Sequence, residues 1–182
     1  MIKRICIFCA SSNQIDSVYK KDAEEIGTLL GQKGLNIING AGNIGLMGIL
    51  TDAVLASGGT VTGVIPQFFV TKGLCHQNLT EVFITETMHE RKKKMSDLAD
   101  AVIALPGGYG TMEELLEIIT WRQIGLQQKP IIILNTNNFY TPLLELFHHA
   151  VEEKFIRTEH AQLYKVAQTP QEVIEILSYP TK

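Results

Sequence analysis

Two short segments of this chain are apolar throughout, Ala101–Leu105 and Pro130–Leu134. A strand with one face in water alternates apolar and polar residues, so an unbroken apolar run predicts a strand covered on both faces. Such strands occur almost only in parallel sheets that have helices on both sides. These two segments therefore constrain the fold more than any other feature of the sequence.

The rest of the chain alternates between short β-branched runs and longer segments of helical period. We expect strands at 2–8, 35–38, 60–65, 79–85, 101–105, 130–134 and 163–166, and helices at 17–33, 44–57, 111–126 and 142–153. A further helix should begin at Met88, and a last one should follow the capping sequence Thr169-Pro170-Gln171-Glu172, whereas residues 67–79 read as irregular. Alternation of this kind predicts an α/β fold with right-handed crossovers: a doubly wound, Rossmann-like, mostly parallel sheet with helices on both faces. The length predicts a single domain over residues 1–182.

Composition excludes several classes of protein. The formal net charge of −3 offers no electrostatic surface for a nucleic acid polymer or an anionic membrane. No run of about 18 apolar residues is present, so we expect no membrane-spanning helix.

Cys6, Cys9 and Cys75 are too few for a disulfide framework and favour a cytoplasmic protein. Cys6 and Cys9 should point to opposite faces of the first strand, which favours buried structural thiols over a redox pair. The five histidines show no metal-ligand spacing, so no metal site is expected.

In doubly wound sheets, ligands bind in the loops that follow the carboxyl ends of the strands. Here these loops are 9–13, 39–45, 66–78 and 106–111. The second of them contains Gly40-Ala41-Gly42-Asn43-Ile44-Gly45, a G-x-G-x-x-G sequence between a strand and a helix. A dinucleotide site would also need an acidic residue about 20 residues further on, and none ends the next strand. Binding of NAD is therefore disfavoured, and close packing of strand and helix stays open as the role of these glycines.

The fourth loop has the stronger signal. Pro106-Gly107-Gly108-Tyr109-Gly110-Thr111-Met112-Glu113-Glu114 follows a fully buried strand directly. Its glycines can form a nest of backbone N–H donors, and the helix after them adds the positive end of its dipole. This chemistry suits a phosphate. The alternative interpretation is a capping box between Thr111 and Glu114, which would only close the end of the helix.

A third motif is Thr87-Met88-His89-Glu90-Arg91-Lys92-Lys93-Lys94-Met95. Thr87 and Glu90 have capping-box spacing, and helical period then places Arg91 on the apolar face, with Lys93 and Lys94 more towards water. Cations in the first turn oppose the helix dipole, so an inward arginine indicates an anionic ligand. A solvated basic patch whose arginine turns outward is the alternative.

These motifs resemble a known family. The segment 106–114 is similar to the P-G-G-x-G-T-x-x-E motif of the Lonely Guy (LOG) family, and Met88-His89-Glu90-Arg91-Lys92 resembles its M-H-x-R-K segment. Further similar segments are Phe8-Cys9-Ala10-Ser11-Ser12, Gly45-Leu46-Met47-Gly48 and Thr120-Trp121-Arg122-Gln123-Ile124-Gly125. The resemblance covers nearly the whole chain. Members of this family are cytokinin-activating nucleoside 5′-monophosphate phosphoribohydrolases, many of them mislabelled as lysine decarboxylases.

The resemblance implies a nucleotide-binding α/β domain that cleaves the N-glycosidic bond of adenine-type nucleoside 5′-monophosphates (AMP or N6-prenyl-AMP) to free base and ribose 5-phosphate. It implies Glu114 and Arg91 as the catalytic pair, a homodimer, and neither a metal nor an organic cofactor. The substrate-binding residues expected from the motifs and the resemblance together are Met88, Lys92, Gly107, Gly108, Tyr109, Gly110, Thr111, Met112, Glu113, Thr120, Ser12, Gly42 and Gly45. A non-catalytic nucleotide-binding module with the same pocket is the main alternative. A decarboxylase that uses pyridoxal phosphate would need a Schiff-base lysine, and the glycine loops contain none.

The chain departs from the family pattern at two positions. Family members usually read Y-G-G-G before the second helix, whereas this chain has Asn39-Gly40-Ala41-Gly42. Alanine there strains the loop if the backbone needs a positive φ. Members often carry a Lys-Glu pair where this chain has Lys72-Gly73, which bears on base preference.

Overall fold

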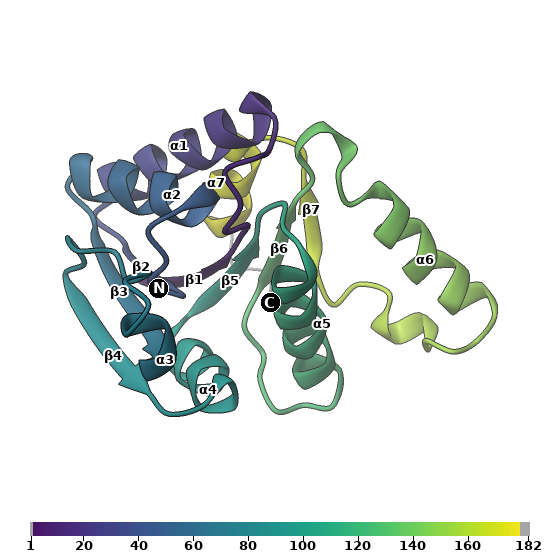
Figure 1. Cartoon of the computed structure of the whole chain (residues 1–182). Helices are drawn as coiled ribbons and strands as arrows, with labels where there is room; N and C mark the ends of the chain where they lie inside the picture. Colours follow the sequence, from purple (N-terminus) through teal and green to yellow (C-terminus); the bar gives the residue numbers. More distant parts are fainter. Residues whose placement is uncertain (1, 179–182) are drawn as a thin grey trace.

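Seven parallel strands form one sheet in the computed structural model, which describes residues 2–178. Their order is β4-β3-β2-β1-β5-β6-β7 (Figure 1). The strands are β1 (Arg4–Phe8), β2 (Asn36–Asn39), β3 (Thr60–Pro66), β4 (Glu81–Thr85), β5 (Ala101–Ala104), β6 (Ile131–Leu134) and β7 (Lys165–Ala167). Every residue of β5 and β6 is buried, as their apolar sequences predict. The predicted doubly wound α/β fold is confirmed, and every described strand pair is parallel.

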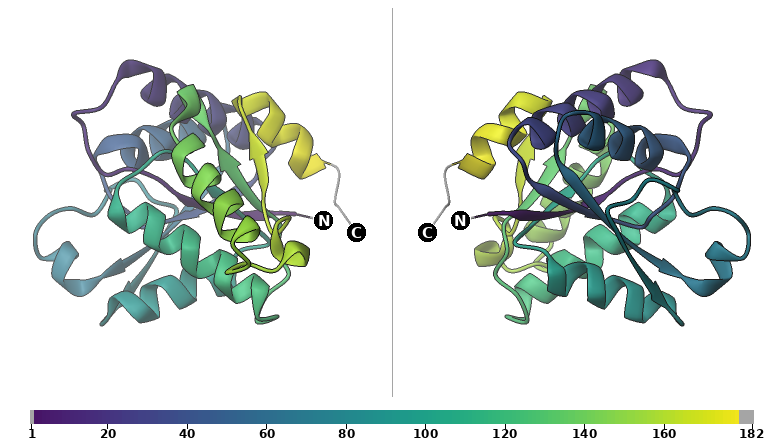
Figure 2. Two further views of the ribbon diagram at one scale, coloured as in Figure 1. Left: turned by 90° about the vertical axis from the view of Figure 1, so that its right-hand side faces the viewer. Right: turned by 90° about the vertical axis from the view of Figure 1, so that its left-hand side faces the viewer.

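Helices cover both faces of the sheet (Figures 1 and 2). One face carries α1 (Ser17–Gln32), α2 (Gly45–Ala56) and α7 (Pro170–Ser178), and the other carries α4 (Met88–Leu98) and α5 (Tyr109–Gln123). The short α3 (Gln67–Val70) follows β3 directly, and α6 (Thr141–Glu152) projects beside the β6–β7 edge. Two 3-10 turns, Thr136–Asn138 and Thr158–His160, flank α6. None of the helices within residues 2–178 is both long and apolar enough to cross a lipid bilayer.

Alternation along the buried strands divides the core into two layers. In β1, Ile5 and Ile7 face the layer beneath α1 and α2, whereas Cys6 and Phe8 face the layer beneath α4 and α5. Cys9 lies in the first layer, so Cys6 and Cys9 are on opposite sides of the sheet as predicted. The thiols of both, and that of Cys75, are free.

Several boundaries differ from the prediction. Residues 67–79 are not irregular throughout, because α3 begins at residue 67 directly after Pro66, whose fixed φ suits the position before a helix. Strand β3 runs one residue beyond the predicted 60–65, since Pro66 belongs to it, in register with Thr85 of β4. Helix α5 begins at Tyr109, two residues earlier than predicted, because Gly108 is its N-cap. It ends at Gln123, before the left-handed Gly125 (φ 79°).

The strand order reverses between β1 and β5. The chain leaves β1 towards α1 on one face and leaves β5 towards α5 on the other. A cavity lies between the two connections, lined by Ala10 and Ser12 after β1 and by Pro106 and Gly107 after β5. The loops that follow these strands stay in contact, since the Ala10 N–H donates to the Pro106 carbonyl at 3.1 Å. Both glycine motifs, which follow β2 and β5, therefore lie at the carboxyl edge of the sheet.

Candidate active site

The glycine loop and the start of α5 form an exposed cluster of backbone donors. Gly108 is the N-cap, and the first intrahelical bond runs from the Met112 N–H to its carbonyl at 3.0 Å. The N–H groups of residues 109–111 precede that bond and are free of intrahelical partners. Gly108 and Gly110 have open space where a Cβ would lie, whereas a Cβ on Gly107 would lie 2.1 Å from the Thr111 hydroxyl oxygen. Gly107 thus allows close packing, and the other two glycines leave room for an anion.

Thr111 and Glu114 do not form a capping box. Helix α5 starts before Thr111, so both residues lie inside it and both are buried. The Glu114 carboxylate instead faces Arg91 of the neighbouring helix α4. The role of these residues is therefore not to close the helix end.

Arg91 and Glu114 form a buried ion pair. Arg91 Nη2 lies 3.2 Å from Glu114 Oε1, and the side chains are 10% and 9% exposed. The arginine is held inward because the Thr87 hydroxyl caps α4 by accepting the Glu90 N–H at 3.1 Å, which sets the helix register as predicted. Arg91 Nη1 contacts the sulfur of Met88 at 3.7 Å, and Arg91 Nε is buried without a partner. The alternative of an outward, solvated arginine is wrong.

Burial governs the ionisation of Glu114. Its pKa is raised from 4.5 to about 7, chiefly because burial removes water from the carboxylate. The positive charges of Arg91 and Lys92 lower this pKa, and the negative charges of Glu113 and Glu117 raise it. A carboxyl group with a pKa near neutrality can act as a base or an acid at physiological pH. The site therefore contains a buried carboxyl group whose pKa lies near neutrality.

Lys92 is buried beside this pair. Its ammonium group contacts the carboxylates of Glu113 and, at 3.1 Å, of Glu117. Those two hydrogen bonds raise the pKa of Lys92 above its ordinary value despite the opposing effect of burial.

Lys93 points into water as predicted, but Lys94 lies over the Phe83 ring, 4.2 Å from its centroid. The sequence analysis did not single out Glu117 as a site residue. Its position four residues after Glu113, on the same face of the helix, was the signal that could have identified it.

The loop after β2 provides a surface for the arginine. A Cβ on Gly40 would lie 2.1 Å from Arg91 Nη2, so the guanidinium lies directly against this glycine. Ala41 has a left-handed backbone with φ 61°, so the position occupied by alanine does require a positive φ. Gly45 also has a positive φ, and a Cβ there would lie 2.6 Å from the backbone of Ser11. Gly45 packs α2 against the loop after β1, and its N–H donates to Asn13 at 2.8 Å.

The remaining predicted residues divide between two cavities and a distant groove. A cavity of about 410 Å³ is lined by Ser12, Gly107, Gly108 and Met112 together with apolar side chains of α1 and α2. A second, of about 170 Å³, is lined by Gly42 and Arg91 together with Gly40, Phe69 and Leu74. The last two were not predicted from the sequence, because only tertiary structure brings α3 and its loop to the arginine.

Two predicted residues stand apart from the pair. The Tyr109 side chain is 94% exposed, so only its backbone is directed into the loop. Thr120 lies about 9 Å further along the axis of α5 than Glu114, in a groove between α5 and α6. Within one chain, Thr120 is therefore not brought to the Arg91–Glu114 pair.

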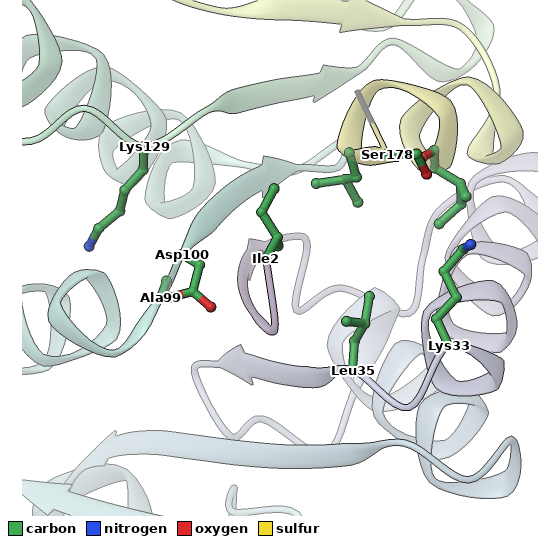
Figure 3. A pocket seen from close by; sticks show the side chains of 9 residues that line it. Ile2, Lys33, Leu35, Ala99, Asp100, Lys129 and Ser178 are labelled. Carbon is green, nitrogen blue, oxygen red and sulfur yellow. The ribbon is translucent and has the colours of Figure 1, made fainter. Parts of the chain in front are cut away.

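A cavity of about 860 Å³ lies at the opposite, amino-terminal edge of the sheet (Figure 3). Lys33 and Lys129 lie on opposite sides of it. The Lys129 ammonium donates to the Ser96 carbonyl, and Asp100 accepts the N–H groups of Lys3 and Arg4 at 2.9 Å. Lys129 thus binds the end of α4, and Asp100 binds the start of β1. Within residues 2–178, no group of three or more metal-ligating side chains is assembled, here or elsewhere.

The fold and the site together define a class: Rossmann-like α/β proteins with a glycine loop and a helix N-terminus at the switch point of the sheet. Comparison with known proteins narrows this class. The family model described as "Possible lysine decarboxylase" matches residues 47–177. The chain is 42% identical to the probable cytokinin riboside 5′-monophosphate phosphoribohydrolase LOGL2 of Oryza sativa subsp. japonica, over 96% of this chain and 72% of the rice protein. It is 43% identical to the phosphoribohydrolase LOG4 of Arabidopsis thaliana, over 96% of this chain and 81% of that one. The chain belongs to this LOG family.

Solved structures agree on the fold. The molybdenum cofactor binding protein of Rippkaea orientalis superposes with a TM-score of 0.74 at 20% identity, covering 98% of this chain and 96% of that one. The Moco carrier protein of Chlamydomonas reinhardtii gives 0.73 at 18% identity, with coverage of 98% and 96%. Similarity at this level of identity extends to the Rossmann-like architecture alone.

Proposed function

We propose that this protein hydrolyses the N-glycosidic bond of adenine-type nucleoside 5′-monophosphates, AMP or its N6-prenylated forms, and releases the free base and ribose 5-phosphate. The observation that carries the proposal is the buried Arg91–Glu114 pair, 3.2 Å apart, next to a helix start that can hold a phosphate. The curated relatives, at 42% and 43% identity, are named as phosphoribohydrolases of cytokinin riboside 5′-monophosphates, which supports the proposal.

Glycosidic cleavage passes through an oxocarbenium-like transition state, which a nearby carboxylate stabilises. Glu114 is the carboxylate in this proposal. Its ionised form faces the ribose, stabilises the developing positive charge, and positions or deprotonates the attacking water. With a pKa of about 7, it can take up the proton of that water at neutral pH.

Arg91 holds Glu114 in position and supports departure of the base. Its Nε is buried without a partner, its guanidinium lies against Gly40, and the side chain lines the smaller cavity. A buried donor without a partner is costly, and a hydrogen-bond acceptor on the substrate would remove that cost. The 5′-phosphate is assigned to the backbone N–H groups of residues 108–111 and to the Thr111 hydroxyl.

Chromatographic detection of the released base tests the proposal, with AMP and N6-isopentenyl-AMP as substrates. Wild-type protein should release base and ribose 5-phosphate from at least one of them. Glu114→Gln keeps the size of the side chain and removes its charge, so turnover should fall about 100-fold or more. Turnover of this variant within threefold of wild type would contradict the role of Glu114. Binding of AMP without release of base by the wild type would instead indicate a non-catalytic nucleotide-binding module.

We further propose that the protein is a homodimer in the cytoplasm. The groove between α5 and α6 is lined by apolar side chains, among them Leu116, Leu144 and Phe147, and no residue of α6 is buried in one chain. A second copy would cover this surface and bring Thr120 into a subunit interface. The free thiols suit a reducing compartment.

A further inference from the structure

Two loops that are distant in sequence pair along their backbones beside the site. The His76 N–H donates to the Ala41 carbonyl at 2.8 Å, and the Asn43 N–H donates to the Leu74 carbonyl at 3.1 Å. Between these bonds, Gly42 and Cys75 form an antiparallel β-bridge. Loop 40–43 is the one against which the Arg91 guanidinium lies. Contacts that hold loops 40–43 and 73–76 in place therefore also hold the surface against which the Arg91 guanidinium lies.

The side chain of His76 attaches this loop pair to helix α2. It is only 8% exposed, and its Nε2 lies 3.0 Å from Asp52 Oδ1. Its Nδ1 accepts the N–H of Asn78 at 3.2 Å, so Nε2 carries the proton and donates it to Asp52. Both ring nitrogens are therefore satisfied, one within the loop and one on a helix.

Loop 40–43 needs such an attachment because its backbone is strained. Ala41 has φ 61°, a left-handed conformation that is unfavourable for a residue with a Cβ. Strained backbone persists only where surrounding contacts overdetermine it. On one side Ala41 N–H donates to Asn39 Oδ1 at 2.8 Å, and Asn39 in turn donates to Thr51 of α2 at 2.9 Å. On the other side its carbonyl is held by the backbone of His76.

We propose that His76 is a positioning residue for glycosidic cleavage: through Asp52 it anchors loops 73–76 and 40–43 to α2, and thereby holds the Arg91 guanidinium against Glu114. This inference rests on the proposed hydrolase function. His76 and Asp52 act without touching the substrate. Loss of their bond lets loop 40–43 relax, and the guanidinium moves with it.

Asp52→Ala is the first variant, because the Asp52 side chain is 71% exposed and its removal leaves the core intact. We expect kcat for AMP, or for N6-isopentenyl-AMP if that is the better substrate, to fall about tenfold, with KM within about twofold. The phosphate loop is untouched, which is why KM should stay. Asp52→Asn keeps an acceptor for the Nε2 proton and should stay within about twofold of wild type.

Two substitutions of His76 separate its two hydrogen bonds. His76→Gln can still donate to Asp52 but loses the acceptor for Asn78, whereas His76→Asn can accept from Asn78 but does not reach Asp52. We expect His76→Gln to retain most of the kcat and His76→Asn to lose about tenfold, as Asp52→Ala does. The double variant His76→Asn/Asp52→Ala should be no slower than either single variant, because all three lose the same bond.

Asp97→Ala is the matched control, since it also removes an exposed carboxylate that pairs with a cation, here Lys93, and Asp97 lies in the last turn of α4, outside loops 40–43 and 73–76. It should leave kcat unchanged. The inference is overturned if Asp52→Ala lowers only the melting temperature and keeps kcat within twofold, or if His76→Gln is as slow as His76→Asn. Absence of base release by the wild type would overturn the proposed function instead, which keeps the two failures distinguishable.

Discussion

Glu114 illustrates how competing effects on one residue decide its chemistry. An arginine at 3.2 Å would normally lower the pKa of a carboxyl group, yet the pKa of Glu114 is raised to about 7 because burial outweighs that attraction. Since the ionised form is the active one, kcat/KM should fall as the pH drops below about 7 and should level off above it. Rates of base release between about pH 5 and about pH 9 measure this profile. A profile that rises towards acid would show that the protonated carboxyl acts instead.

The neighbours of Glu114 allow its pKa to be moved in both directions. Lys92 lowers the pKa of Glu114 and Glu113 raises it. Lys92→Gln should therefore shift the acidic limb of the kcat/KM profile to higher pH, and Glu113→Gln should shift it to lower pH, each by roughly half a unit. The substrate phosphate titrates near pH 6 in every assay, so the difference between the variants isolates the enzyme. Shifts of the same sign in both variants would contradict this assignment.

At the scale of elements, helix α2 carries a left-handed glycine at each end. A Cβ on Gly45 would lie 2.6 Å from the Ser11 backbone, whereas a Cβ on Gly58 would meet nothing within 4 Å. Gly58→Ala should therefore lower the free energy of unfolding by about 1 kcal/mol, the cost of its φ of 87° alone. Gly45→Ala adds a backbone overlap and should cost about 3 kcal/mol. Denaturant unfolding compares the two, and equal losses would mean that the overlap is relieved by a shift of the loop.

At the scale of the whole molecule, the proposed homodimer can be tested through the α5–α6 groove. Leu116 lines this groove and is 41% exposed in one chain. Leu116→Asp would bury an unpaired charge in the interface and should weaken association at least about tenfold. Light scattering or sedimentation at several concentrations measures the change. Lys33→Asp, at the other edge of the sheet, is the control. A dimer unaffected by Leu116→Asp would place the interface elsewhere.

Much of the fold and part of the site follow from local sequence patterns. The apolar runs of β5 and β6 predicted strands buried on both faces, and the alternation of elements predicted the doubly wound sheet. The capping residue Thr87 set the register of α4, and with it the inward direction of Arg91. These features depend on neighbours within a few residues, which the sequence displays directly.

Other features depend on partners distant in sequence. The left-handed backbone of Ala41 is held by Asn39 and by the backbone of His76, and the contact of Gly40 with Arg91 joins β2 to α4. The pKa of Glu114 reflects burial between two helices, which no local pattern contains. By itself, the sequence determined the order of elements, the loops that meet at the carboxyl edge of the sheet, and the inward arginine, because periodicity and capping are local. Only the tertiary structure decided which charges pair, how far a carboxyl group is desolvated and which loop supports the arginine, because distance and dielectric environment exist only once the chain has folded.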